Sequence, residues 1–287
     1  MITCNLMGGL GNQLFQIFAT MSYAIDCKQP FKFLNVHKLG GGSTTVRYTF
    51  WDTLFYNLKP FLIKEIPLNI EVIREKGFSY NALKISEPSN KDIMLYGYFQ
   101  SYKYFQDNYN IIIRLIGLET KKETLKKKLN LTNEYLRNTI SIHFRIGDYK
   151  KIQQYHPLTT YEYYERALTY IQEINAINTQ NTTNFHIFYF CEDDDHEDVL
   201  KIINRLTRIF TDYSFTRGDN KLTDWEQMLF MSCCHHNIIA NSSFSWWGAY
   251  FNSNKDKMVC YPSVWFGEIA SNDVKDLCPI YWRKINV

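Results

Sequence analysis

Two short runs of β-branched residues, each ending abruptly in polar groups with glycine or serine, constrain the fold of this chain more than any other feature. They occupy residues 141–149 and 237–248. A parallel strand that is buried on both faces delivers polar residues at its carboxyl end in this way. Two such ends predict a parallel sheet and a single pocket for a phosphorylated ligand.

Strand and helix patterns alternate along the rest of the chain. We expect strands at 2–7, 31–34, 93–96, 140–146, 185–190 and 238–239, and helices at 13–25, 120–138, 160–174, 195–210, 224–233 and 245–251. Such alternation predicts an α/β fold. We expect two domains, 1–135 and 136–287, that face each other across a ligand-binding cleft. A last helix is expected to pack back on the first domain.

Composition and charge limit the function. The 287 residues carry a net charge of only +3, which argues against a dedicated nucleic-acid-binding protein. A lysine cluster at 121–128 is interpreted as a solvated helix face. No apolar run approaches the roughly 18 residues of a membrane span. The aromatic content of 16% is typical of core packing first and of sugar or base stacking second.

Metals and redox cofactors are not expected. The seven cysteines are odd in number and no pair has metal-ligand spacing, which predicts reduced thiols and a cytoplasmic protein. The adjacent Cys-Cys-His-His of 233–236 cannot converge on one ion. The acidic run 192–198 suits either a divalent ion beside a diphosphate or a helix start, and we favour the helix start. The loop 8–13 lacks the last glycine of a dinucleotide loop, where Leu14 stands, so a nicotinamide cofactor is not expected.

The two strand ends carry the candidate chemistry. Alternation along the first places His143 and Arg145 on one face, near the end of the strand. The planar fork of arginine suits a phosphate, whereas the alternative is a structural ion pair with Asp148. Ser242 and Ser243 stand where the second strand turns into a helix, so they either cap that helix or bind an anion at its start. The two roles are compatible.

Four separated segments resemble the α-1,2-fucosyltransferases of glycosyltransferase family eleven. They are Gly8-Gly9-Leu10-Gly11-Asn12-Gln13-Leu14-Phe15-Gln16, Gly97-Tyr98-Phe99-Gln100-Ser101, the 143–149 segment and the 238–248 segment. They follow the family order over nearly the whole chain. The resemblance implies a GT-B architecture of two Rossmann-like domains and metal-independent, inverting transfer from GDP-β-L-fucose to the 2-hydroxyl of galactose. Because the chain begins at its first strand, it resembles the soluble microbial or viral members.

The resemblance also assigns donor-binding roles. His143 should approach the guanine or ribose, and Arg145 should hold the β-phosphate. The remaining donor contacts are assigned to Ser242, Ser243 and Phe244. Gln227 stands where family members often carry an acid, so the nearby Asp224 and Glu226 are candidates to contact guanine.

On the acceptor side the resemblance points to Asn12, Gln13 and Gln100. Asn12 is similar to the glycine-loop asparagine of protein O-fucosyltransferases, which lies near the reacting centre. Asp148 is the candidate base, and Asn12 is expected to orient the acceptor hydroxyl. The leaving diphosphate would be stabilised by Arg145 and by the amides that begin the helix after the second strand.

The expected partners are a nucleotide sugar and a galactose-containing oligosaccharide. Two alternatives remain open. One is transfer of another GDP-deoxysugar, such as rhamnose, which the sequence does not distinguish. The other is a glycan-binding module that has lost catalysis, and the intact His143, Arg145 and Asp148 argue against it.

Overall fold

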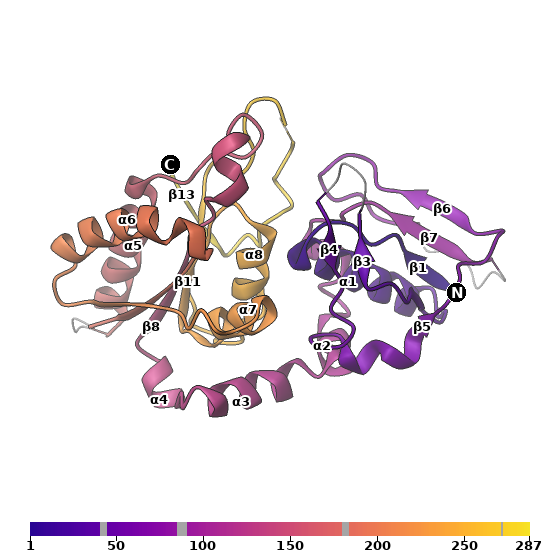
Figure 1. Cartoon of the computed structure of the whole chain (residues 1–287), viewed down its shortest axis with the longest axis horizontal. Coiled ribbons are helices and arrows are strands. Elements are labelled where there is room, and N and C mark those ends of the chain that lie inside the picture. The colour runs from indigo at the N-terminus through magenta and orange to yellow at the C-terminus, as the bar shows by residue number, and fades with distance from the viewer. Residues whose placement is uncertain (41–44, 85–90, 180–183, 271) are drawn as a thin grey trace. The chain divides into compact units, whose positions relative to one another are not determined.

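The computed structural model describes residues 1–40, 45–84, 91–179, 184–270 and 272–287. These residues divide into two compact units, Met1–Lys121 with Asn272–Pro279, and Lys122–Ser271 with Ile280–Val287. Each unit contains a sheet of parallel strands with helices packed on it (Figure 1). The predicted α/β class, with two separate parallel-sheet units, is therefore confirmed.

The first unit starts with a strand, a glycine loop and a long helix. Its principal sheet has the parallel order β1-β7-β6, β2 pairs in parallel with β5, and β3 and β4 form an antiparallel ribbon. The elements are β1 (Ile2–Cys4), α1 (Leu10–Asp26), β2 (Phe33–Leu34), β3 (Lys38–Leu39), β4 (Arg47–Tyr48), η1 (Tyr56–Phe61), β5 (Leu62–Ile63), β6 (Glu71–Arg74), β7 (Ile93–Tyr96), η2 (Tyr102–Tyr104), α2 (Tyr109–Ile116) and α3 (Leu118–Lys128), which crosses into the second unit.

Helix α1 is the core of the first unit. Leu14, Phe15, Ile17 and Phe18 are completely buried, because the helix carries apolar residues on nearly every face. Gly8, which precedes it, adopts a left-handed backbone with φ of +74°. A Cβ at that position would lie 2.5 Å from Nδ2 of Asn12, so only glycine lets the loop turn this close to the helix start.

The second unit is a six-stranded, wholly parallel sheet in the order β10-β9-β8-β11-β12-β13. Figure 1 shows α5 and α6 on one face of this sheet and α7 and α8 on the other. The elements are α4 (Asn133–Leu136), β8 (Thr139–His143), η3 (Gly147–Lys151), α5 (Tyr161–Thr179), β9 (His186–Phe190), η4 (Asp193–Asp195), α6 (His196–Ile209), β10 (Ser214–Arg217), α7 (Asp224–Cys233), β11 (His236–Ile238), α8 (Ser243–Tyr250), β12 (Val259–Pro262) and β13 (Arg283–Ile285).

The core of the second unit follows the predicted alternation along β8. Ile140, Ile142 and Phe144 are buried in one cluster with residues of α5 and α6. Phe144 packs on Tyr164, with ring centroids 4.3 Å apart. The strand that carries the candidate donor residues is thus anchored by apolar contacts on the α5 and α6 face of the sheet.

Several expected boundaries are wrong. The strand expected at 140–146 ends at His143, because the backbone turns into a helical conformation at Ile146. The helix expected at 120–138 is two helices, since Asn130 adopts a left-handed backbone and Thr132 caps α4 by accepting from the amide of Tyr135. The chain ends in strand β13 rather than a last helix.

The expected domain boundary at 135/136 lies within the second unit, because the division falls inside α3. The lysine cluster of that helix is also not uniformly solvated. Lys122 is 4% exposed, and its ammonium donates to the carbonyl of Phe251 at 3.1 Å and to Oγ of Ser253 at 3.2 Å. The sequence Gly40-Gly41-Gly42-Ser43 predicts a flexible loop, and residues 41–44 lie outside the described residues.

Candidate functional site

Three neighbouring strand ends of the second unit converge. β8 lies between β9 and β11, and His143 at the end of β8 is paired with Phe190 at the end of β9. Ile142 is paired with Ile238, the last residue of β11. The polar segments that follow these three parallel strands therefore leave the same edge of the sheet, where ligands of open α/β sheets bind.

His143 is buried at this edge. Its ring lies 5.4 Å from the ring of Phe244, so the two strand-end segments meet. Burial first, and then the positive charge of Arg145, lower the pKa of His143 to about 3, so the imidazole is neutral near pH 7. Its Nδ1 is buried without a hydrogen-bond partner among the described residues. A neutral ring with a free nitrogen can accept or donate one hydrogen bond to a ligand.

Two carboxylates and a tyrosine ring surround the guanidinium of Arg145. Its guanidinium binds Asp148 at 2.5 Å and also forms an ion pair with Glu192, which follows β9. It lies over the ring of Tyr149, 5.1 Å from the centroid. Burial is the largest single influence and lowers the pKa of Arg145, but the nearby negative charges, first Glu192 and then Asp148, together raise that pKa above its ordinary value. The ion pair with Asp148 that the sequence left as an alternative is thus present.

The acidic run after β9 begins a helix, as expected. η4 leads directly into α6, and Glu197 and Asp198 lie in the first turn of α6. Two carboxylates of the run, Asp193 and Asp195, bind protein groups. Asp195 accepts from the backbone amide of Gly147 at 2.6 Å and from Lys150 at 3.3 Å, and Asp193 binds Arg217 at 2.5 Å.

The end of β11 leads into α8 through a fixed turn. Ser242 is the N-cap of α8, and its hydroxyl accepts from the amide of Phe244 at 3.3 Å. Asn241 holds the turn in place, because its amide donates to the carbonyls of Pro157 at 2.9 Å and Trp265 at 3.1 Å. The Tyr149 hydroxyl donates to the Asn241 carbonyl at 3.2 Å, a second link between the two segments. Ser243 is the first residue of α8.

Asp224 and Glu226 lie in the first turn of α7. Glu226 forms a capping box, accepting from the amide of Thr223 at 3.0 Å and from its hydroxyl at 2.8 Å. It also binds Lys128 at 2.6 Å. These contacts explain the position of Glu226 by helix capping. A guanine contact for either carboxylate stays a prediction.

The first unit brings together two of the three candidate acceptor residues. The Gln100 side-chain amide donates to Oδ1 of Asn12 at 2.8 Å. Gln13 is completely buried, and its amide donates to the carbonyls of Gly8 at 3.0 Å and Tyr48 at 2.9 Å. Gln13 therefore holds the glycine loop against β4, whereas Asn12 and Gln100 form a side-chain pair that is half-buried.

A pocket of about 580 Å³ lies at the carboxyl ends of β1, β2 and β7, and neither Asn12 nor Gln100 is among its lining residues. Its lining includes Asn5 after β1, Gly8 of the glycine loop, Tyr98 after β7, and Lys38 and Arg47 of the antiparallel ribbon. A pocket of this size holds a small sugar, and Tyr98 offers an aromatic side chain on which sugars stack.

The sequence missed partners that depend on strand order. Glu192 contacts Arg145, and Asp195 fixes the Gly147 amide, because β9 lies next to β8. The acidic run 192–198 showed that carboxylates follow β9, but the sequence did not show that β8 is the strand beside β9. Among the described residues, no group of three or more His, Cys, Asp and Glu side chains is arranged to hold a metal ion. All seven cysteines are free.

The parallel sheets and the converging strand ends place the protein in the α/β class, in which ligands commonly bind at the carboxyl edge of a sheet. The sequence model of Glycosyl transferase family 11 matches residues 71–282. The chain belongs to this family, and it is therefore a glycosyltransferase.

Curated relatives match along the whole chain. An alpha-1,2-colitosyltransferase of Escherichia coli is 27% identical, over 99% of this chain and 98% of the relative. A galactoside 2-alpha-L-fucosyltransferase of Caenorhabditis elegans is 23% identical, over 100% of this chain and 79% of the relative. A solved structure, an Arabidopsis thaliana FUT1 mutant in complex with GDP, is 9% identical with a TM-score of 0.45, over 90% of this chain and 69% of that one. No helix in the described part of the chain has the length and apolar character needed to cross a membrane.

Proposed function

We propose that the protein moves L-fucose from GDP-β-L-fucose to the 2-hydroxyl of a galactoside and forms an α-1,2 linkage with inversion. The observation that carries this proposal is the meeting of the β8 and β11 ends, where His143 and Phe244 lie 5.4 Å apart. Membership of family 11 gives the reaction class, and the fucosyltransferase relative suggests the sugar.

The second unit is the proposed donor unit. Arg145 supplies a permanent positive charge, and the start of α8 is proposed to supply backbone amides that bind the phosphates. His143 and Phe244 offer a neutral ring nitrogen and an aromatic face for the nucleoside. Positive charge from an arginine and a helix start suffices for a leaving diphosphate, so we propose transfer without a divalent ion.

The reaction needs one bond to form and one to break. The galactoside 2-oxygen attacks the anomeric carbon of the fucosyl group, and the bond from that carbon to the β-phosphate oxygen breaks, leaving its electron pair on GDP. The acceptor proton passes to a base, for which Asp148 is the candidate because its carboxylate is half-exposed beside Arg145. Asn12 and Gln100 of the first unit are proposed to hold the acceptor through their hydrogen-bonded side-chain amides.

A second donor has specific support. The colitosyltransferase relative is 27% identical, and colitose differs from fucose by the missing 3-hydroxyl. A pocket that hydrogen-bonds a hydroxyl discriminates strongly against the analogue that lacks it, whereas an apolar pocket does not. The donor preference therefore reports whether a polar group faces the 3-position of the sugar.

A donor panel tests the proposal. The full chain is incubated with lactose and, in separate reactions, GDP-fucose, GDP-colitose and GDP-rhamnose, with and without a chelator, and the product linkage is read by NMR. We expect an α-1,2-fucosyl product from GDP-fucose at the highest kcat/KM, unchanged by the chelator. Transfer from GDP-colitose alone establishes the second candidate, and chelator-sensitive transfer contradicts metal independence.

A further inference from the structure

Glu75, the residue that follows β6, holds the backbone of the neighbouring strand end. Its carboxylate accepts from the amide of Tyr98 at 2.7 Å through Oε2 and from the amide of Phe99 at 2.9 Å through Oε1. Its own amide donates to the carbonyl of Tyr96 at 2.9 Å. Burial raises the pKa of Glu75 above its ordinary value, and the hydrogen bonds from the two amides offset only part of this increase.

This clamp imposes an unusual backbone on the segment after β7. Phe99 is fully buried and adopts a left-handed conformation with φ of +52°, which is rare for a bulky residue. Gly97 leaves the space that the clamp requires, because a Cβ there would lie 2.3 Å from Cβ of Glu75. A strained conformation of this kind persists only where the surroundings determine it, and the carboxylate of Glu75 is one restraint, because it holds the Phe99 amide.

The consequence of the clamp is the direction of Gln100. This residue directly follows Phe99, and its side-chain amide donates to Oδ1 of Asn12 at 2.8 Å. Asn12 is fixed in turn by the tight glycine loop, where Gly8 has φ of +74°. The contacts form a continuous path from Glu75 through the 98–99 backbone to the Asn12 and Gln100 pair.

We propose that Glu75 is a positioning residue for the acceptor, which holds the 98–99 backbone so that Gln100 and Asn12 present a fixed pair of amides. The inference rests on the proposed acceptor-binding role of Asn12 and Gln100. Glu75 is proposed to act through the 98–99 backbone, without contacting the acceptor itself. Its loss should weaken acceptor binding while leaving donor binding unchanged.

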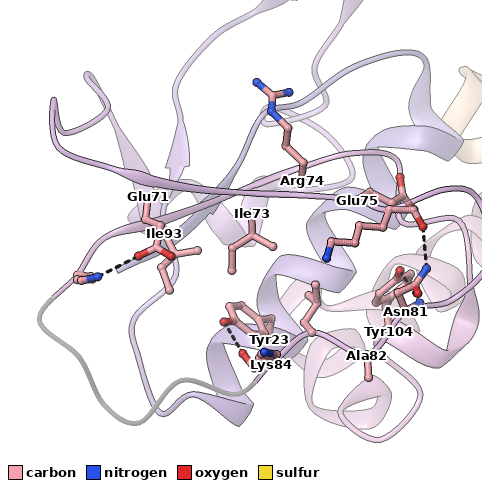
Figure 2. Close-up of a pocket in the computed structure, with 13 residues that line it drawn as sticks. Tyr23, Glu71, Ile73, Arg74, Glu75, Asn81, Ala82, Lys84, Ile93 and Tyr104 are labelled. Carbon is pink, nitrogen blue, oxygen red and sulfur yellow. Dashed lines mark hydrogen bonds and ion pairs between the residues drawn. The ribbon is translucent and has the colours of Figure 1, made fainter.

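The same strand supplies a matched control. Figure 2 shows Glu71 and Glu75 at opposite ends of the lining of a cavity of about 640 Å³, Glu71 beside Ile93 and Glu75 beside Asn81 and Tyr104. Glu71 is exposed and forms an ion pair with Lys91 at 3.3 Å. Glu71→Gln therefore removes the same charge from the same region without touching the 98–99 backbone.

The experiment measures kcat and both KM values for the wild type, Glu75→Gln, Gln100→Ala, the double variant and Glu71→Gln. The glutamine at position 75 keeps one acceptor oxygen and turns an NH₂ group toward a backbone donor, so we expect the acceptor KM to rise roughly tenfold. The donor KM of Glu75→Gln should stay unchanged. In the control Glu71→Gln, both KM values and the melting temperature should match those of the wild type. Because Glu75 acts through Gln100, the double variant should be no worse than Gln100→Ala alone.

Additive losses in the double variant, or equal changes in donor and acceptor KM, overturn the inference. If Glu75→Gln does not fold, Glu75→Asp keeps both oxygens on a shorter stem and should show the same split in KM at a smaller size. Amide hydrogen exchange at Tyr98 and Phe99 should be faster in either variant than in Glu71→Gln. A wild type that transfers no sugar from any donor overturns the proposed function instead, and unchanged exchange at those two amides then overturns the clamp as well.

Discussion

Arg145 is the residue on which the proposed chemistry depends. Its guanidinium already binds two carboxylates, Asp148 at 2.5 Å and Glu192, and it lies over the ring of Tyr149. A diphosphate brings more negative charge than either carboxylate, so a donor would displace at least one of them. The existing ion pairs hold the planar fork at the edge of the sheet before the donor arrives.

Arg145→Lys should lower kcat about a hundredfold or more, a loss of roughly 2–4 kcal/mol of transition-state stabilisation. Lysine keeps the charge but loses the planar fork. The affinity for GDP should fall less than kcat, because the contact strengthens as the bond breaks. Steady-state kinetics and calorimetric GDP binding measure the two effects. Near wild-type turnover at saturating donor would show that Arg145 is structural.

Asp148→Asn should lower kcat by roughly 10²–10⁴-fold and retain GDP binding, because an amide cannot take the acceptor proton. Glu192→Gln is the matched control, since Glu192 is the other carboxylate on Arg145 and is not proposed as a base. It should retain turnover. Equal losses in the two variants would mean that Asp148 serves only to hold Arg145.

At the scale of helices and strands, the sequence predicted the apolar, buried elements and missed the polar strands at the edges of the sheets. Helix α7 and strand β7 have the expected bounds, and α1 is buried as its apolar spacing indicated. Strands β6 and β10 lie at sheet edges and carry charged or polar residues, so they give no strong period.

The site shows the same division. The two strand ends that carry His143 and Ser242 were identified because hydrophobic runs stop there. Their meeting was inferable because parallel strands share an edge. Two contacts could not be inferred, namely that of Glu192 with Arg145 and that of Glu75 with the 98–99 backbone. Each depends on the order of the strands in its sheet, which the sequence does not show.

Helix α8 is held at its carboxyl end by two lysines. Lys122 donates to the Phe251 carbonyl at 3.1 Å, and Lys257 donates to the Ala249 carbonyl at 3.1 Å and to that of Asn252. Burial, and then the charge of Lys122, lower the pKa of Lys257 to about 8. Cations at this end complement the helix dipole whose other end begins at Ser242.

Lys122→Ala should therefore lower the free energy of unfolding by about 1–3 kcal/mol, because it leaves a buried carbonyl without its donor. Lys127→Ala, on the exposed side of the same helix, should change it by less than about 0.5 kcal/mol. Urea unfolding measures both. Equal effects of the two substitutions would contradict the assigned role of Lys122.

At the scale of the whole molecule, buried histidines predict acid sensitivity. Burial lowers the pKa of His143 and of His236 from 6.5 to about 3. Between these values the unfolded chain binds protons that the native protein does not. Stability is therefore retained above pH 6.5 and lost as the pH falls toward 3, by about 1.4 kcal/mol per pH unit for each histidine.

His236→Asn isolates one of these contributions. Nδ1 of His236 accepts from the amide of Met258 at 3.0 Å, and an asparagine oxygen can take that place without titrating. Between pH 6.5 and 5, the free energy of unfolding should fall less steeply in the variant than in the wild type, by about 1.4 kcal/mol per pH unit. Identical slopes in the two proteins would show that His236 is protonated in the native state.

The central claim is that the donor binds at the strand ends of the second unit, and hydrogen exchange with and without GDP tests it most directly. Binding should slow exchange in peptides that cover 143–149 and 241–247, which include Arg145 and the start of α8. Peptides before Thr120 should change little. Protection confined to residues before Thr120, with none at 143–149 or 241–247, would contradict the assignment of the donor site.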